Sequence, residues 1–160
     1  MLVFLLYVKP KFMPQKPSLY LAADHAGHAL KEKIKAKLSA KRQVLDLSPD
    51  LDKDDDYPLH AKKVALALQN DPKALGILFC GSGHGMDIAA NRFKGIRAIV
   101  ARTTKDAALA REHNHANVLV LGGWGTKPAL AQSIIETFLT TKPSPAARHK
   151  RRVNELDQLL

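Results

Sequence analysis

The chain of 160 residues has almost no cysteine: Cys80 is the only one. A single thiol excludes a disulfide bond within the chain, and it excludes a metal site built from several cysteines. Cys80 must therefore serve either packing or chemistry.

Long hydrophobic runs are also missing. The first apolar stretch, residues 2–8, is far shorter than the ~20 residues that a membrane-spanning helix needs. No basic segment precedes it and no small-residue cleavage site follows it, so it is a poor secretory signal. We expect a cytoplasmic protein in which residues 1–17 are an N-terminal extension outside the core, with Met13 as an alternative start. Residues 18–160 are expected to form a single domain.

Acidic residues are scarce relative to basic ones. The chain has 25 Lys and Arg against 15 Asp and Glu, which gives a formal net charge of +10. Such a surface attracts anions, and charge alone leaves nucleic acids, phosphorylated metabolites and acidic membranes open as partners. Much of the excess lies in residues 9–16, 31–41 and 148–152. We expect a solvated helix face for four of these lysines: Lys31, Lys33, Lys35 and Lys37.

Apolar runs alternate with helical periodicity along the chain, a pattern typical of strand–helix units around a parallel sheet. We predict strands over residues 18–23, 43–47, 75–79, 96–100 and 118–121, and helices over 28–38, from 58 onward, 85–91, 105–113, 128–139 and 147–159. The predicted fold class is α/β: a three-layer αβα sandwich around a five-stranded parallel, doubly wound (Rossmann-like) sheet of strand order 2-1-3-4-5. A basic helix follows at the C-terminal end.

Chemically rich stretches follow three of the predicted strands. In doubly wound sheets, ligands bind beyond the carboxyl ends of the strands, and residues 24–27, 80–85 and 122–125 lie there. The stretch GSGHG at 81–85 joins a strand to a helix, so its glycines and free N–H groups can cradle an anion. It is neither the dinucleotide fingerprint nor the P-loop, and a tight turn is the alternative interpretation.

Cys80 directly precedes this loop. A buried structural thiol is the commonest role of a lone cysteine, but a helix N-terminus can lower a thiol pKa from ~8.5 to ~3.5–7.5. A thiolate here would act as a nucleophile or a general base beside amides that stabilise an oxyanion. Asp24 and His25 are either a hydrogen-bonded turn or functional groups that the sheet places beside Cys80.

Two pairs of residues in the second half of the chain have two interpretations each. His113 and Asn114 end a predicted helix, where the helix dipole alone favours a histidine. Arg148 and Arg152 are four residues apart and share a helix face, so together they can clamp one phosphate. A basic tail for nucleic acid is the competing interpretation.

Seven motifs in the chain resemble one known family. They are DHAG at 24–27, DYP at 56–58, CGSGHGM at 80–86, IAAN at 88–91, GIRA at 95–98, REHNHANV at 111–118 and RHKRRV at 148–153. In this order, over about residues 20–156, the sequence is similar to ribose-5-phosphate isomerase B and the related galactose-6-phosphate isomerase subunits.

The resemblance implies an aldose–ketose isomerase that interconverts ribose 5-phosphate and ribulose 5-phosphate through a cis-enediol(ate), without metal or cofactor. It implies that Cys80 is the general base, that Ser82 and the loop amides hold the enediolate oxygen, and that His113, assisted by Asp24, opens the sugar ring. The substrate contacts that it implies are Tyr57, Gly81, Gly83, Gly85 and Asn114, with His25, Arg148 and Arg152 on the phosphate.

The resemblance also implies a homodimer, with a tetramer as a larger alternative, whose active site is shared because the neighbour supplies the His113–Asn114 pair. The expected ligand is a small sugar phosphate. Neither a membrane nor a nucleic acid is expected as a partner.

Three positions depart from the family's pattern. Trp124 stands where the family usually has a phosphate-binding arginine, His84 where a small apolar residue is more common, and Asp87 where serine is usual. Trp124 keeps open an isomerase of a six-carbon sugar phosphate, of the galactose 6-phosphate or allose 6-phosphate type. A non-catalytic sugar-phosphate-binding subunit is a further alternative, against which the intact set of Cys80, Ser82 and His113 argues.

Overall fold

The computed structural model describes residues 19–159 of the chain. The expected N-terminal extension, residues 1–17, lies outside the described residues, as do Ser18 of the first predicted strand and Leu160. No helix within residues 19–159 combines the length and the apolar character that crossing a bilayer requires.

Five parallel strands form one sheet: β1 (Leu19–Ala23), β2 (Val44–Asp46), β3 (Leu75–Cys80), β4 (Ala98–Val100) and β5 (Val118–Gly122). Their spatial order is β2-β1-β3-β5-β4, so the expected order 2-1-3-4-5 was wrong for the last two strands. The physical reason lies in their burial. The apolar residues of β5, 118–121, are completely buried, as a central parallel strand requires, whereas the three-residue β4 is partly exposed and suits an edge.

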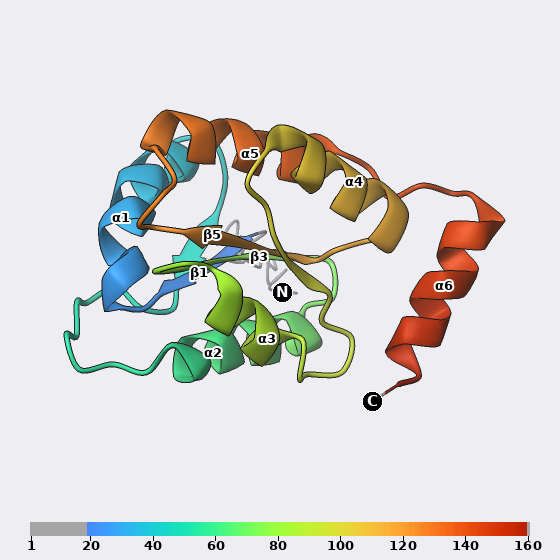
Figure 1. The fold of residues 1–160 in the computed structure, drawn as a ribbon, viewed down its shortest axis with the longest axis horizontal. Coiled ribbons are helices and arrows are strands. Elements are labelled where there is room, and N and C mark those ends of the chain that lie inside the picture. Colours follow the sequence, from blue (N-terminus) through green and yellow to red (C-terminus); the bar gives the residue numbers. More distant parts are fainter. Residues whose placement is uncertain (1–18, 160) are drawn as a thin grey trace, which may run out of the picture.

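Helices cover both faces of the sheet (Figure 1). One face carries α1 (His25–Ser39), α4 (Thr104–Asn114) and α5 (Pro128–Thr140), and the other carries α2 (Tyr57–Asn70) and α3 (His84–Ala90). Alternate residues of the central strands point into two apolar cores, so that Phe79 packs on the first face and Leu78 on the second. The three-layer αβα sandwich with a doubly wound sheet is thus confirmed. The basic α6 (Ala147–Asp157) stands beside α4, apart from both layers.

Side-chain caps and prolines set where the helices begin. Asp24 accepts a hydrogen bond from the Gly27 N–H at 2.9 Å, so α1 begins at His25, three residues before the predicted start. Thr103 and Asp106 form a reciprocal capping box at the start of α4. Proline stands in the first turn of both α2 and α5, where its missing N–H costs no helical hydrogen bond.

Gly27 allows the start of α1 to approach β3 closely. A Cβ atom at this position would lie 2.3 Å from the carbonyl group of Phe79, so any other residue would push the helix away. The close contact holds the N-terminal turn of α1 beside the carboxyl end of β3, where Cys80 lies.

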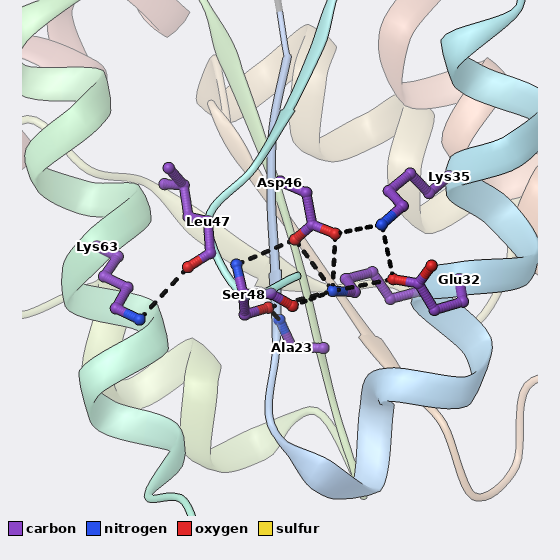
Figure 2. Close-up of polar contacts among 8 residues, drawn as sticks. Ala23, Glu32, Lys35, Asp46, Leu47, Ser48 and Lys63 are labelled. Carbon is purple, nitrogen blue, oxygen red and sulfur yellow. Dashed lines mark hydrogen bonds and ion pairs between the residues drawn. The ribbon is translucent and has the colours of Figure 1, made fainter. Parts of the chain in front are cut away.

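Lys31 is completely buried, so the expected solvated face was wrong for this lysine. Its Nζ lies 2.8 Å from one carboxylate oxygen of Asp46 and 3.0 Å from the other, and it also donates to the Ser48 carbonyl oxygen. Lys35 binds the same carboxylate at 2.7 Å (Figure 2). The acidic partner is on β2, which folds back against α1, and helical periodicity alone does not reveal it. Lys33 and Lys37 are exposed as expected.

The same network anchors the segment that leaves β2. The Ser48 hydroxyl accepts a hydrogen bond from the N–H of Ala23, the last residue of β1, at 2.7 Å (Figure 2). The loop of residues 47–56 is therefore tied at its start to the strand end that precedes Asp24.

Candidate functional site

The carboxyl ends of β1 and β3 bring the first group of predicted site residues together. Ala23 pairs with Phe79 in the sheet, and the Asp24 N–H donates to the Phe79 carbonyl oxygen at 3.2 Å. The next residues of the two chains, Asp24 and Cys80, therefore lie side by side. We call the predicted residues at this end the carboxyl-edge cluster: Asp24, His25, Tyr57, Cys80, Gly81, Ser82, Gly83 and Gly85.

Cys80 is the last residue of β3 and is buried, with 4% of its surface exposed. The chain turns back at Gly83, whose φ of 94° favours glycine, and the Gly83 N–H points at the Cys80 sulfur at 3.1 Å. The thiol thus sits under the glycine loop and receives a backbone hydrogen bond from it.

Burial raises the pKa of the Cys80 thiol above its usual value. Backbone N–H groups of Met86, Gly83 and Ser82 lower the pKa, and the charge of Asp24 raises it, but desolvation is the largest influence. Of the two environments considered for Cys80, the buried thiol therefore describes this site better than a helix N-terminus that lowers the thiol pKa. The helix after the loop has only seven residues, and its N–H groups do not outweigh the loss of water around the sulfur.

Two aromatic rings pack against the glycine loop. A Cβ atom at Gly85 would lie 2.8 Å from the Tyr57 ring, and one at Gly81 would lie 2.5 Å from the Trp124 ring. Both glycines therefore lie directly under an aromatic ring. Trp124 is nevertheless 79% exposed. Ser82, on the loop itself, is also exposed.

A hollow of about 340 Å³ opens beyond the ends of β3, β4 and β5, on the side of the loop that Trp124 covers. Its lining includes Ser82, His84, Arg102 and Trp124. The Arg102 Nη2 lies 3.0 Å from the His84 Nε2, so a guanidinium group stands in the same hollow as Trp124. Sequence analysis missed Arg102, which follows the edge strand without any motif of its own.

His25, at the first position of α1, is held by a carboxylate from the loop before α2. Its Nδ1 lies 2.8 Å from Asp55 Oδ1, and its backbone N–H donates to the same oxygen at 3.0 Å. The other oxygen of Asp55 lies 2.7 Å from the Nε2 of the buried His60. Sequence analysis missed Asp55 and His60, although both flank the DYP motif at 56–58; the acidic loop gave no reason to single out one carboxylate.

The remaining predicted residues form a second group at the opposite end of the sheet. His113 and Asn114 end α4, which starts after the carboxyl end of β4 and runs back toward the amino end of β5. Arg148 and Arg152 are exposed on α6, which packs against α4. We call these four residues the amino-edge cluster.

A second histidine links the two helices of the amino-edge cluster. The His113 ring lies 4.5 Å from the ring of His149, measured between centroids. Arg148 Nε donates to the His149 Nε2 at 3.1 Å. Burial lowers the pKa of His149, and so do the nearby His113 and Arg148, so that this ring is kept neutral. Sequence analysis missed His149, which sits inside the RHKRRV motif.

A single chain does not bring the two clusters together. The eleven residues of α4 span about 16 Å at the usual helical rise, which separates His113 from the edge where Cys80 lies. Asp24, the expected assistant of His113, instead caps α1 in the same chain. In the described residues, no group of three or more His, Cys, Asp and Glu side chains is arranged to hold a metal ion.

A groove of about 380 Å³ lies between α6 and the edge strand β4, away from Cys80. Its lining includes Ile96, Asn114, Leu156 and Leu159, and both leucines are exposed. An apolar rim therefore borders the amino-edge cluster.

Comparison with known proteins gives close relatives over most of the chain. A family profile described as Ribose/Galactose Isomerase matches residues 19–156. Ribose-5-phosphate isomerase B of Mycobacterium tuberculosis is 42% identical over 140 residues, which are 86% of this chain and 86% of that protein. The protein of the same name from Escherichia coli is 39% identical over 134 residues, or 83% of this chain and 89% of that one.

Solved structures agree with this result. A ribose 5-phosphate isomerase from Thermotoga maritima has 42% identity and a TM-score of 0.84, covering 89% of this chain and 99% of that chain. Ribose-5-phosphate isomerase B of Mycoplasma genitalium, with bound ribulose-5-phosphate, has 39% identity and a TM-score of 0.82, covering 88% and 94%. The resemblance seen in the sequence motifs is thus confirmed, and the chain belongs to the ribose/galactose isomerase family of enzymes.

Proposed function

We propose that this chain interconverts ribose 5-phosphate and ribulose 5-phosphate through a cis-enediol(ate). The proposal is supported by the similarity to ribose-5-phosphate isomerases B, one of them with bound ribulose-5-phosphate. The observation that carries it is the Cys80 sulfur at the carboxyl end of β3, hydrogen-bonded by the Gly83 N–H under the glycine loop. A base beside backbone donors is what enolisation requires.

In the proposed reaction, the Cys80 thiolate takes the proton from C2 of the open-chain aldose and returns it to C1. The hydroxyl proton moves from O2 to O1, so the step is balanced without any oxidant or reductant. Ser82 and the amides of Gly81 and Gly85 hold the negative oxygen of the enediolate, while the Gly83 N–H faces the Cys80 sulfur and shapes the loop around it. The raised pKa of Cys80 makes its thiolate a stronger base, although a smaller fraction of the thiol is ionised at neutral pH.

The amino-edge cluster of a second copy completes the proposed site. In this arrangement His113 of the neighbour, with Asp24 of the first chain, opens the sugar ring, and Asn114 and Tyr57 contact the sugar. His25 binds the phosphate together with Arg148 and Arg152. The distance between the two clusters supports a homodimer as the smallest active unit, and the apolar rim at Leu156 and Leu159 supports a contact surface there.

Turnover of ribose 5-phosphate, followed by NMR, tests the proposal. We expect the chain to produce ribulose 5-phosphate. The Cys80→Ala variant should be slower by about 10²- to 10⁴-fold, which is the usual contribution of a general base. Thermal unfolding of the variant serves as the control for its fold. Absence of turnover by the unmodified chain would overturn the proposed ribose 5-phosphate isomerase activity. Full activity of the variant would overturn the role of Cys80 as the base.

A six-carbon sugar phosphate is the second candidate substrate, because of Trp124. Its ring lies over Gly81 and is largely exposed, in a place where the family usually has an arginine. The same NMR assay with allose 6-phosphate and galactose 6-phosphate separates the two substrates, and inactivity on all three would favour a non-catalytic subunit. A cytoplasmic location and a single domain over residues 18–160 stay predictions.

A further inference from the structure

The Asp55 carboxylate connects two histidines from different helices at the carboxyl edge of the sheet. Oδ1 lies 2.8 Å from the His25 Nδ1 and accepts the His25 backbone N–H at 3.0 Å. Oδ2 lies 2.7 Å from the His60 Nε2. Both oxygens are thus engaged, and the carboxylate joins the start of α1 to the first turns of α2.

This arrangement is shielded from water on one side only. The side chains of Asp55 and His60 are 9% and 10% exposed, whereas that of His25 is 48% exposed. The His60 Nδ1 is buried and, within residues 19–159, has no hydrogen-bond partner. The buried His60 ring meets the carboxylate through Nε2, which makes it a fixed support for Asp55.

The contacts with Asp55 leave one nitrogen of His25 available. Nδ1 faces the carboxylate, and no partner of the Nε2 is found in the described part of the chain. A ring whose Nδ1–H is bound by a carboxylate has a fixed orientation, and its Nε2–H is directed away from that carboxylate. The ring is half exposed at the N-terminal end of a 15-residue helix, an environment that attracts anions.

The charges that face His25 favour its protonated form. The hydrogen bond to Asp55 raises the pKa of His25, burial lowers it, and the charges of Asp24 and Asp55 raise it, with a net shift upward. Burial alone raises the pKa of Asp55, but hydrogen bonds from His25 and His60 bring it below its usual value. The two groups thus stabilise each other in their charged forms.

We infer that Asp55 is a positioning residue, braced by His60, that orients the His25 imidazole so that its Nε2–H faces the phosphate group of the substrate. The inference rests on the proposed function, since it takes the ligand to be a sugar phosphate. It adds two residues to the site, neither of which touches the substrate.

The test compares Asp55→Asn with Asp54→Asn in the full chain. Both changes remove one negative charge from the same loop, but Asp54 is exposed, and the hydrogen bonds found for His25 in residues 19–159 go to Asp55, so Asp54→Asn is the matched control. Binding of inorganic phosphate is measured by calorimetry at pH 6 and pH 8, together with the KM and kcat for ribose 5-phosphate. NMR of the imidazole protons follows the titration of His25.

We expect Asp55→Asn to weaken phosphate binding about tenfold at pH 8, where a His25 with an ordinary pKa near 6.5 is neutral. At pH 6 the ring is protonated in both proteins, so the loss should shrink to about twofold. KM should follow the same pattern while kcat stays within about twofold, and the His25 pKa should fall. The inorganic phosphate itself changes its protonation between the two pH values, but this affects both proteins equally.

A loss of affinity that is equal at both pH values, or that Asp54→Asn also shows, would overturn the inference in favour of a general effect of the loop. If Asp55→Asn does not fold, His60→Phe is used instead, because it removes only the hydrogen bond between His60 and Asp55. Unchanged phosphate binding by that variant would then overturn the inference. Failure of the proposed function is distinguishable: the chain would leave ribose 5-phosphate unchanged, while phosphate binding and the His25 titration still decide the role of Asp55.

Discussion

Trp124 stands after the carboxyl end of β5, at a position where the sequence resemblance leads us to expect a phosphate-binding arginine. The ring covers Gly81 without burying itself, and Arg102 stands in the adjacent hollow. Since a guanidinium group binds phosphate with two parallel hydrogen bonds, the position of the nearest arginine affects affinity more than the rate of proton transfer.

Trp124→Arg should therefore lower the KM for ribose 5-phosphate by roughly three- to tenfold, with little change in kcat, because it adds a charge-assisted contact. Trp124→Phe keeps an aromatic ring over Gly81 without adding charge, and steady-state kinetics of the two variants side by side make the comparison. Equal KM values in the two variants would show that this position does not face the phosphate.

At the scale of elements, the contact between α1 and β2 depends on a buried ion pair. Lys31 has no exposed surface, and Asp46 accepts from both Lys31 and Lys35. Burial raises the pKa of Asp46, but hydrogen bonds from the two lysines and from the Ser48 N–H leave it below its usual value. This pair therefore contributes stability above the unfolded pKa of about 3.9, and the contribution is lost as the pH falls through the lower, folded value.

Lys31→Met should reduce the free energy of unfolding by about 3–5 kcal/mol, because it leaves a buried carboxylate and the Ser48 carbonyl group with fewer partners. Lys33→Met is the matched control: this lysine is exposed on the same helix, and its replacement should change stability by less than about 0.5 kcal/mol. Urea denaturation at pH 7 measures both. Similar midpoints for the two variants would contradict a stabilising role for the buried pair.

At the scale of the whole molecule, the carboxyl-edge cluster lies at the carboxyl ends of the strands and the amino-edge cluster lies toward their amino ends. Cys80 ends β3, whereas His113 ends a helix that has run back along the sheet. If both residues serve one site, that site must lie between two copies of the chain, and in a dimer with twofold symmetry each copy supplies both halves once.

Mixing two inactive variants should then restore activity. Cys80→Ala and His113→Ala, each inactive alone, should recover about a quarter of the wild-type rate after subunit exchange, because half of the dimers are mixed and each mixed dimer has one intact site. Turnover before and after exchange is the measurement, and a mixture of wild type with Cys80→Ala gives the reference. No recovery, with exchange shown by mass spectrometry, would contradict a site that is shared between two copies of the chain.

Local patterns in the sequence were sufficient for most of the fold. The apolar run of residues 75–79, the i, i+4 spacing of Leu30 and Ile34, and the prolines in the first turns of α2 and α5 are all local signals. Each predicted element is present within a few residues of its expected bounds. The motif positions of Asp24 and Cys80 also placed them correctly at one edge, because β1 and β3 are neighbours in both the expected and the observed sheet.

Tertiary structure decided what depends on distant partners. Lys31 has the sequence pattern of a surface lysine, but it is buried against Asp46, 15 residues away. Likewise, the contact of Asp55 with His25 joins residues that are 30 positions apart. The place of β5 next to β3 and the raised pKa of Cys80 likewise depend on burial by the whole molecule. The sequence by itself thus determined the elements and the chemical groups, whereas the pairing and burial that tune those groups arise from long-range contacts, because burial and charge pairing depend on proximity in space and not along the chain.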